Sequence, residues 1–307
     1  MTGRAPRVPN AIHMTVTLRG VVSEHSQAAI LSIFAGIVVE HVAALRGALV
    51  KLAARRPSDE DLHQFRVTLR RLRSAWVTFG PVLPEAFAAE WKPRLRALAA
   101  STGPVREWDV LLSDWLPTVQ QSLAEEDEVG RAWLTAAITK AKAARSRSWR
   151  SLRADLASPD VLNTLADLEM AVLPFRLAVE AGPHAEFARD QARVLRKKLI
   201  DRGRGPKQAS PARLHRARIT AKQWRYLYEA FYLALGAQAP KRCHAHLRKL
   251  QDALGEVHDA AISLERAAGV VKDVPPASIV SAFHKRARVA RKRAARQLRW
   301  IREHPAV

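Results

Sequence analysis

The sequence predicts an all-α fold that is built from two copies of one helical unit. Leu, Ala, Arg, Glu and Gln dominate almost every segment, and no convincing alternation of apolar and polar residues indicates a strand. The stretch HQFRVTLRRLRSAWVTF at 63–79 returns 152 positions later as HRARITAKQWRYLYEAF at 215–231, with a histidine and three cations at the same spacing. Similarity at a fixed offset indicates a repeated supersecondary unit.

Stretches that contain proline and glycine, such as RRPS, GPVLP and GRGPKQASP, separate the predicted helices. Helices of the first group are expected at 24–56, 59–79, 85–102, 105–123, 129–156 and 160–178. Helices of the second group are expected at 184–202, 211–235, 240–254, 256–269 and 276–303. The chain is therefore divided into a mobile N-terminal segment (1–23), a first repeat (24–156), a linker region (157–183) and a second repeat (184–307).

The similarity between the two copies extends on both sides of the motif. A serine stands at the expected N-cap of each motif helix, and in the second copy Pro211 follows it at the first helical position. Downstream, LRALAASTGPVRE at 95–107 matches LRKLQDALGEVHD at 247–259. The corresponding positions include Ser58 with Ser210, Arg46 with Arg196, and Arg106 with His258.

Each motif helix has one cationic face and one apolar face. At 100° per residue, the histidine and the three cations of the first copy fall within a sector of about 80°. These residues are His63, Arg66, Arg70 and Arg73, and their counterparts are His215, Arg218, Lys222 and Arg225. The apolar residues fall on the opposite side and are expected to face the core. They are Leu62, Phe65, Leu69, Leu72, Trp76 and Phe79 in the first copy, and Leu214, Trp224, Tyr228 and Phe231 in the second.

A basic helix face is often no more than a solvated surface. Solvated faces usually mix Glu with Lys, whereas here neighbours three and four positions apart are both positive, which costs roughly 0.2–0.5 kcal/mol per pair. The duplication of this self-repelling row favours two half-sites that face one anionic ligand. Arginine predominates, and because its planar guanidinium binds two phosphate oxygens at once, phosphate is the best-matched group. The basic runs at 140–153 and 283–302 are expected to add a few residues to the same site.

The charge of the chain indicates a polyanionic partner. Its 307 residues include 51 Lys and Arg against 29 Asp and Glu, a formal charge of +22. Nucleic acid, an anionic membrane surface and an inorganic polyanion are the candidates. The most apolar run, at 29–40, is too short to span a bilayer, so we expect a buried helix and no membrane insertion. Cys243 is the only cysteine, which excludes an intrachain disulfide and indicates a reducing compartment.

Motifs of enzymes that act on phosphates are absent from the sequence. It has no Gly-x-x-x-x-Gly-Lys loop, no His-Glu-x-x-His helix and no Glu-x-Glu-x-Lys strand. In CHAH at 243–246, Cys243 and His246 share a helix face while His244 points elsewhere, so no metal site is expected there. Three carboxylates sit beside basic residues and are interpreted as groups that orient them: Glu107, Asp109 and Asp259. We expect no enzyme activity and no cofactor.

These motifs resemble the CHAD family, whose name stands for conserved histidine α-helical domain. The resemblance covers about 24–303 and rests on the doubled pattern His-x-x-Arg-[Val/Ile]-x-x-[Arg/Lys]-x-x-Arg, each time followed by Leu-x-x-Leu and Gly-x-x-[Arg/His]-[Asp/Glu]. It implies two four-helix bundles, related by a pseudo-two-fold axis, around a basic central cavity that binds inorganic polyphosphate. The ligand residues that it implies are His63, Arg66, Arg70, Arg73, His215, Arg218, Lys222 and Arg225, with Arg46, Arg196, Arg106 and His258 as additions. The first copy departs from the pattern at Glu107, where an aspartate is usual.

The sequence leaves three functions open. The first is non-catalytic binding of inorganic polyphosphate. The second is nucleic-acid binding, although proteins that bind single strands usually present aromatic side chains for base stacking, and the aromatic residues here are expected in the core. The third is an enzyme that acts on polyphosphate or another phosphorylated substrate, for example through a phosphohistidine at His63 or His215. We expect the first function, in the cytoplasm, with polyphosphate granules as a candidate location.

Overall fold

The structure is a computed structural model that describes residues 24–54, 58–177, 184–206, 208–235 and 239–304. All regular secondary structure within these residues is helical, which confirms the predicted all-α class. The N-terminal segment 1–23, predicted to be mobile, lies outside the described residues.

The helices follow the predicted order closely. The first group contains α1 (Glu24–Ala53), α2 (Asp59–Thr78), α3 (Glu85–Ser101), α4 (Gly103–Val110), the π-helical turn η1 (Leu111–Trp115), α5 (Leu116–Ser122), α6 (Glu128–Ala157), α7 (Pro159–Val172) and the 3₁₀ turn η2 (Leu173–Leu177). The second group contains α8 (His184–Arg202), α9 (Pro211–Ala230), α10 (Tyr232–Leu235), α11 (Ala239–Val271) and α12 (Ala277–Glu303).

The helix break predicted near 255 is wrong, because α11 runs through Gly255 without interruption. In the first copy, the corresponding stretch does divide into α3 and α4, and Pro104 stands in the first turn of α4. Proline lacks a backbone N–H and its ring clashes with the preceding turn, so a helix cannot continue through it without a kink. The second copy has Glu256 at the corresponding position. Glycine alone weakens a helix by only about 1 kcal/mol, and α11 is held by packing against α9 and α12.

The predicted N-caps of both motif helices are confirmed. The Ser58 side chain accepts a hydrogen bond from the Asp61 backbone N–H, and the Asp61 carboxylate accepts one from the Ser58 backbone N–H at 2.8 Å. Ser210 caps α9 in the same way by accepting from the Arg213 backbone N–H. Each cap satisfies donors that a helix leaves unpaired at its start, and so fixes where the motif helix begins.

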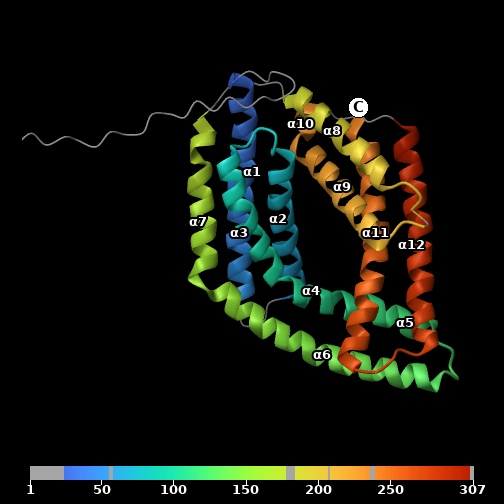
Figure 1. Ribbon diagram of the computed structural model, residues 1–307. Helices are drawn as coiled ribbons and strands as arrows, with labels where there is room; N and C mark the ends of the chain where they lie inside the picture. The colour runs from blue at the N-terminus through green and yellow to red at the C-terminus, as the bar shows by residue number, and fades with distance from the viewer. Residues whose placement is uncertain (1–23, 55–57, 178–183, 207, 236–238, 305–307) are drawn as a thin grey trace, which may run out of the picture.

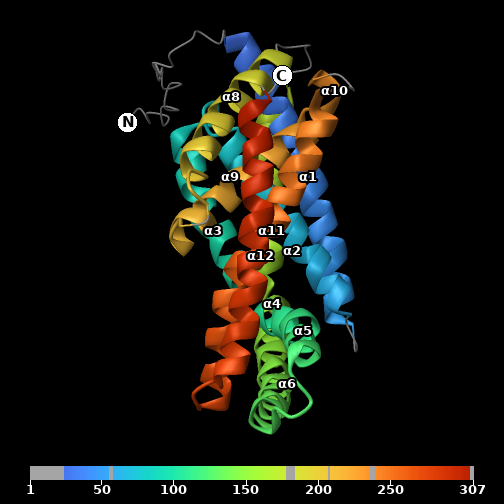
Figure 2. The ribbon, with the colours of Figure 1, turned by 90° about the vertical axis from the view of Figure 1, so that its right-hand side faces the viewer.

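The helices surround the middle of the molecule. Figure 1 shows α1, α2, α3 and α7 on one side and α11 and α12 on the other, with α6 along the bottom and α8, α9 and α10 at the top. The side view in Figure 2 places α3 and α1 on opposite sides of the molecule. The motif helices α2 and α9 pack against each other, so the two copies of the motif meet directly.

Two hydrophobic clusters stabilise this arrangement. The larger one joins α1, α2, α3, α7, α8 and α9 with parts of α11 and α12. The smaller one joins α4, η1, α5 and α6 with α11 and α12, and its Trp115 and Phe283 rings stack with centroids 5.1 Å apart. Both clusters contain residues from both predicted repeats, so the repeats share their cores.

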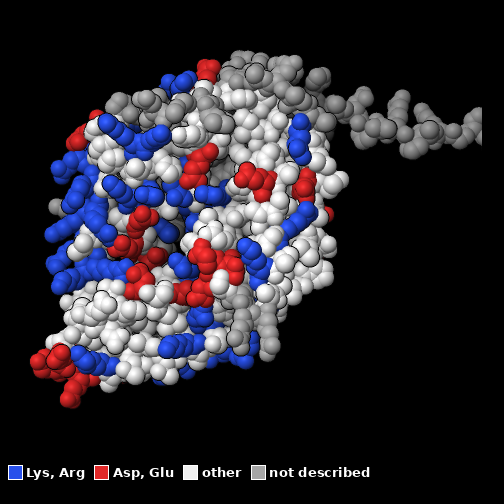
Figure 3. All heavy atoms as spheres, turned by 180° about the vertical axis from the view of Figure 1, so that it is seen from behind, with Lys and Arg blue, Asp and Glu red and all other residues white. Residues whose placement is uncertain are grey.

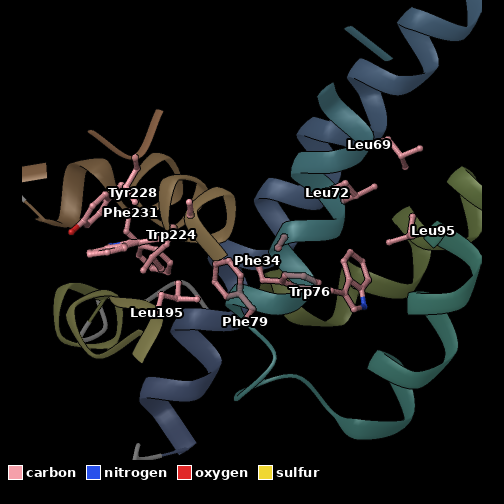
Figure 4. Packing of buried hydrophobic residues seen from close by; sticks show 14 of the residues in the cluster. Phe34, Leu69, Leu72, Trp76, Phe79, Leu95, Leu195, Trp224, Tyr228 and Phe231 are labelled. Carbon is pink, nitrogen blue, oxygen red and sulfur yellow. The ribbon is translucent and has the colours of Figure 1, made fainter. Parts of the chain in front are cut away.

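Aromatic side chains carry the contact between the two motif helices. Phe34 and Phe79 pack in the larger cluster with ring centroids 5.4 Å apart, and Phe79, the C-cap of α2, contacts Phe231, the C-cap of α9, at the same 5.4 Å (Figure 4). Phe79 and Phe231 are counterparts at the offset of 152. A contact between counterparts is what a two-fold relation between the repeats would produce.

The apolar N-terminal run forms part of this core. Ile30, Phe34, Ala35 and Val38 of α1 are fully buried, as predicted for a core helix. Among the helices of the described residues, only α1, over Gln27–Ala53, is long and apolar enough to cross a membrane. Its buried residues belong to the larger cluster, which accounts for part of that composition.

Replacement of Phe79 by Ala is expected to lower the free energy of unfolding by about 3–5 kcal/mol, because a fully buried ring is removed from the core. Replacement of Phe231 should cost a similar amount. The double variant should cost less than the sum, because the two rings contact each other. Urea denaturation followed by circular dichroism measures all three values.

The matched control is Val50→Ala on α1, whose side chain is 74% exposed and should change stability by less than about 0.5 kcal/mol. Strict additivity of the two phenylalanine variants would show that the ring contact does not couple the motif helices.

Candidate anion-binding site

The contact between α2 and α9 brings cations of both motif copies to one pocket. Arg70 of α2 donates a hydrogen bond from Nε to the Tyr226 hydroxyl of α9 at 2.8 Å, which ties the two helices together. Beside this contact, α2, α3 and α9 enclose a pocket of about 440 Å³. We call it the basic pocket, and its lining consists of Arg70, Arg73, Ser74, Trp76, Val77, Lys92, Leu95, Arg96, His215, Arg218, Ile219, Lys222 and Gln223.

Five of the twelve predicted ligand residues line the basic pocket, namely Arg70, Arg73, His215, Arg218 and Lys222. Four others adjoin it without lining it. His63 and Arg66 continue the cationic row of α2, and both lie in the electrostatic field of Arg106 on α4. His258 of α11 packs against His215, with ring centroids 4.5 Å apart. The cationic row thus extends from the pocket toward α4 and α11.

The structure leaves three predicted residues outside the pocket. Arg225 turns toward the carboxylate of Glu229, with 3.5 Å between Nε and Oε1. Arg46 makes an ion pair of 2.6 Å with Glu169 on α7, and Arg196 donates to the Arg302 carbonyl at 3.0 Å. These positions match between the copies, but their charges are engaged elsewhere in the fold.

Sequence reasoning missed Lys92 and Arg96 of α3, which line the pocket opposite α9. Their spacing of four residues places both cations on one face of a helix, next to the buried Trp91 and Leu95, and this was the signal in the sequence that could have identified them.

The basic runs at 140–153 and 283–302 contribute no residue to the pocket lining. Two of those cations contact other helices instead: Lys140 donates to the Val271 carbonyl at 2.8 Å, and Arg286 pairs with Asp114 at 2.8 Å. The expectation that the runs contribute to this lining is therefore wrong.

Two carboxylates lie close to the cationic row. Asp109 is only 5% exposed and accepts a hydrogen bond of 2.6 Å from Arg145 Nε, close to the charge of Arg66. Asp259 of α11 lies near Arg218 and Arg106. Glu107 instead pairs with Arg266, so in the first copy Asp109 provides the carboxylate beside Arg66.

Burial and mutual repulsion lower the pKa values of the cations in and beside the pocket. Burial, together with the charges of Arg70, Arg218, Arg73 and Arg225, lowers the pKa of Lys222 to about 7. Burial and the neighbouring cations likewise lower the pKa of Arg66 to about 10 and that of His258 to about 4. The pKa values of His63, His215 and Arg218 are lowered mainly by burial. A bound polyanion would reverse the repulsion and favour the charged forms.

Three residues of the pocket lining have a buried polar atom that lacks a partner within the described residues. The atoms are the Nε of Arg218, the Nδ1 of His215 and the Nε1 of Trp76. A buried polar group without a hydrogen bond costs about 1–3 kcal/mol. Phosphate oxygens entering the pocket would supply acceptors for such groups.

The opposite side of the α2–α9 contact differs in charge. A smaller pocket of about 240 Å³ lies there between α1, α2 and α9, and it contains Glu40 and Glu229 beside His41 and Arg71. Figure 3 shows the molecule from behind, with Asp and Glu gathered over the middle of that face and Lys and Arg along the edge formed by α12. Anion binding is therefore favoured on the side of α3.

The CHAH segment is engaged in packing. Cys243 is buried, and the ring of His246 stacks on Trp300 at 3.6 Å and bonds to Gln297 at 2.7 Å. Within the part of the chain that the structure describes, no group of three or more His, Cys, Asp or Glu side chains is arranged to hold a metal ion.

Comparison with known proteins agrees with this architecture. The crystal structure of the CHAD domain from the plant Ricinus communis superposes with a TM-score of 0.64 at 24% identity, covering 96% of this chain and 93% of that chain. The structure of PptA from Streptomyces chartreusis superposes with a TM-score of 0.62 at 16% identity, covering 89% of this chain and 99% of the other. No curated protein matches this sequence.

At these identities the structural likeness establishes the fold alone. The family is established independently, because the model of the CHAD domain family matches residues 37–268, which is well over half of the chain. That match includes both motif helices, α3, α4 and most of α11. The chain is a member of the CHAD domain family.

Proposed function

We propose that the protein binds inorganic polyphosphate in the basic pocket without transforming it. The observation that carries the proposal is the convergence of Arg70 and Arg73 with Arg218 and Lys222 on one pocket, since these cations come from both motif copies. A compact anion could not neutralise so extended a row. Membership of the CHAD family supports the same ligand.

The length of the cationic row suits a chain of phosphates. The residues from 63 to 73 rise by about 15 Å along α2, at 1.5 Å per residue. A flexible polyanion that follows this row also meets the cations of α9 across the pocket. The second contact then forms within one complex, at a high effective concentration, so long chains should bind more tightly than pyrophosphate.

Nucleic acid remains the competing ligand, because it would be attracted by the same charges. Proteins that bind single strands usually stack bases on exposed aromatic rings. Trp76 and Trp224 of the motif helices are only 6% and 1% exposed, so they offer no such surface. A competition assay of long polyphosphate against RNA and DNA at physiological salt tests the choice. Equal or tighter binding of RNA would favour a nucleic-acid-binding protein.

Reversal of charge in one motif copy is expected to weaken polyphosphate binding at least about tenfold, because charge-assisted hydrogen bonds contribute about 1.5–3 kcal/mol each. The test variant is Arg70→Glu with Arg73→Glu, titrated with long polyphosphate in a calorimeter. The matched control is Arg147→Glu with Arg150→Glu on α6, which changes the net charge equally at exposed positions. Equal losses in the two variants would indicate general attraction and no specific pocket.

Polyphosphate binding is expected to weaken as the pH rises from 7 to 9. Free Lys222 has a pKa of about 7 and the bound anion raises it, so binding takes up a proton in this range. One proton taken up corresponds to at most about a tenfold change in affinity per pH unit. Calorimetry in two buffers of different ionisation enthalpy counts the protons.

Lys222→Arg provides the control for this pH dependence, because arginine stays charged throughout the range. The variant should show a flatter pH profile, while titration of the phosphate groups themselves remains the same in both proteins. A profile identical to that of the unchanged protein would mean that Lys222 does not titrate on binding.

We also propose that the protein does not hydrolyse its ligand. Incubation with polyphosphate and Mg²⁺ or Mn²⁺ should release no more orthophosphate than a protein-free blank. Steady release that is abolished by replacing His63 or His215 with Ala would establish an enzyme and overturn this view.

A further inference from the structure

One lysine of the basic pocket lies in an environment that changes its chemistry. Lys222 lines the pocket together with Arg70, Arg73 and Arg218. The positive charges of these three arginines, and that of Arg225 on α9, act on its amine. Within the described residues, Lys222 has no carboxylate within ion-pair distance. Its amine is therefore surrounded by cations and accessible from the pocket.

Such an amine is a nucleophile at neutral pH. With a pKa of about 7, roughly half of the Lys222 amines carry a free lone pair at pH 7. An ordinary lysine, with a pKa of about 10.4, is neutral in roughly one molecule in two thousand at that pH. A lowered pKa of this origin is a recognised means of activating lysine.

The same surroundings would hold an electrophile that carries a phosphate. Arg70, Arg73 and Arg218 supply donors for phosphate oxygens on the pocket walls around Lys222. The pocket volume of about 440 Å³ leaves room for a small acyl phosphate. The phosphate group would be bound while the adjoining carbonyl carbon faces the amine.

We propose that Lys222 is a site of acylation by small acyl phosphates, the mixed anhydrides of carboxylic and phosphoric acids. The Nζ lone pair attacks the carbonyl carbon and forms the C–N bond. The bond between that carbon and the bridging oxygen breaks, and its electron pair leaves with orthophosphate. The amine gives its proton to the departing phosphate or to water, so the products are an amide and orthophosphate.

Acylation would convert a titrating amine into a neutral amide that occupies the pocket. The modified protein has one fewer cation on α9 and less room for a phosphate chain. We therefore expect acylation to weaken polyphosphate binding several-fold. This regulatory consequence rests on the proposed function, whereas the modification itself does not.

The test is incubation of the full chain with acetyl phosphate at pH 7.5, followed by peptide mass spectrometry over time. Lys222 should be acetylated at least about tenfold faster than Lys51, which is exposed on α1 and lies outside the pocket. Lys92, an exposed residue of the same pocket, shows whether the pocket position alone is sufficient. The rate at Lys222 should rise through pH 7 and level off near pH 8. Acetylation of Lys222 no faster than Lys51 would overturn the proposal.

Two further arms separate the roles of reactivity and binding. A neutral acetylating ester should modify Lys222 with a smaller preference over Lys51. Arg73→Gln should slow the reaction with acetyl phosphate more than the reaction with the ester, because it removes a phosphate donor as well as one of the charges that lower the pKa of Lys222. An equal preference for both reagents would refute the step in which the pocket holds the phosphate group.

Long polyphosphate should protect Lys222 from acetylation. If Lys222 is acetylated rapidly but polyphosphate gives no protection, the acylation site stands and the proposed function fails.

Discussion

The packing of α2 against α9 brings together two helices whose cationic faces repel each other. Buried aromatic residues hold them in place, with Phe79 against Phe231 at 5.4 Å, and the Arg70–Tyr226 hydrogen bond adds a polar tie. Fully burying one phenylalanine contributes about 1.5–3 kcal/mol, which exceeds the repulsion of a single exposed cation pair. The apolar faces of the motif helices therefore determine where their charges lie.

The position of the pocket inside this packed framework explains its unusual chemistry. On a free surface, water would screen the cations and the lysine would stay fully charged. Between α2, α3 and α9 the charges are partly withdrawn from water, so repulsion and desolvation act together on Lys222. The protein thus keeps a group that destabilises its free form but would interact favourably with an anion. Such a conflict between stability and binding is expected at a functional site.

Helical periodicity predicted which faces of the motif helices are buried, because each row of apolar residues is set by the local sequence. The caps at Ser58 and Ser210 were predicted from the serines themselves, because an N-cap side chain acts within its own helix. Helical periodicity could not show that α11 is continuous. The first copy has Pro104 where the chain divides into α3 and α4, whereas the second copy has Glu256 at the same position and its helix continues. Gly255 by itself indicates a possible helix break, but the glycine does not interrupt α11.

The site itself was predictable only in part. The cations of each motif helix could be assigned to the site because they share one narrow sector of the helix surface. Lys92 belongs to α3 instead, and it lines the pocket only because α3 packs beside α2. Arg46 and Arg196 fit the repeat equally well in sequence, but a carboxylate on α7 and a helix-end carbonyl engage them. Long-range partners of this kind leave no mark in the local pattern.

The unequal charge of the two sides of the α2–α9 contact has a consequence for the way the molecule moves. Cations line the pocket beside α3, whereas Asp and Glu gather over the middle of the opposite face (Figure 3). This separation adds a dipole moment, directed across the molecule, to its net charge of +22. In the field of a large polyanionic body the protein experiences a torque as well as an attraction, within the screening length of about 8 Å at physiological salt. It would rotate so that the acidic middle of the opposite face points away from the polyanion, which shortens the orientational search before contact.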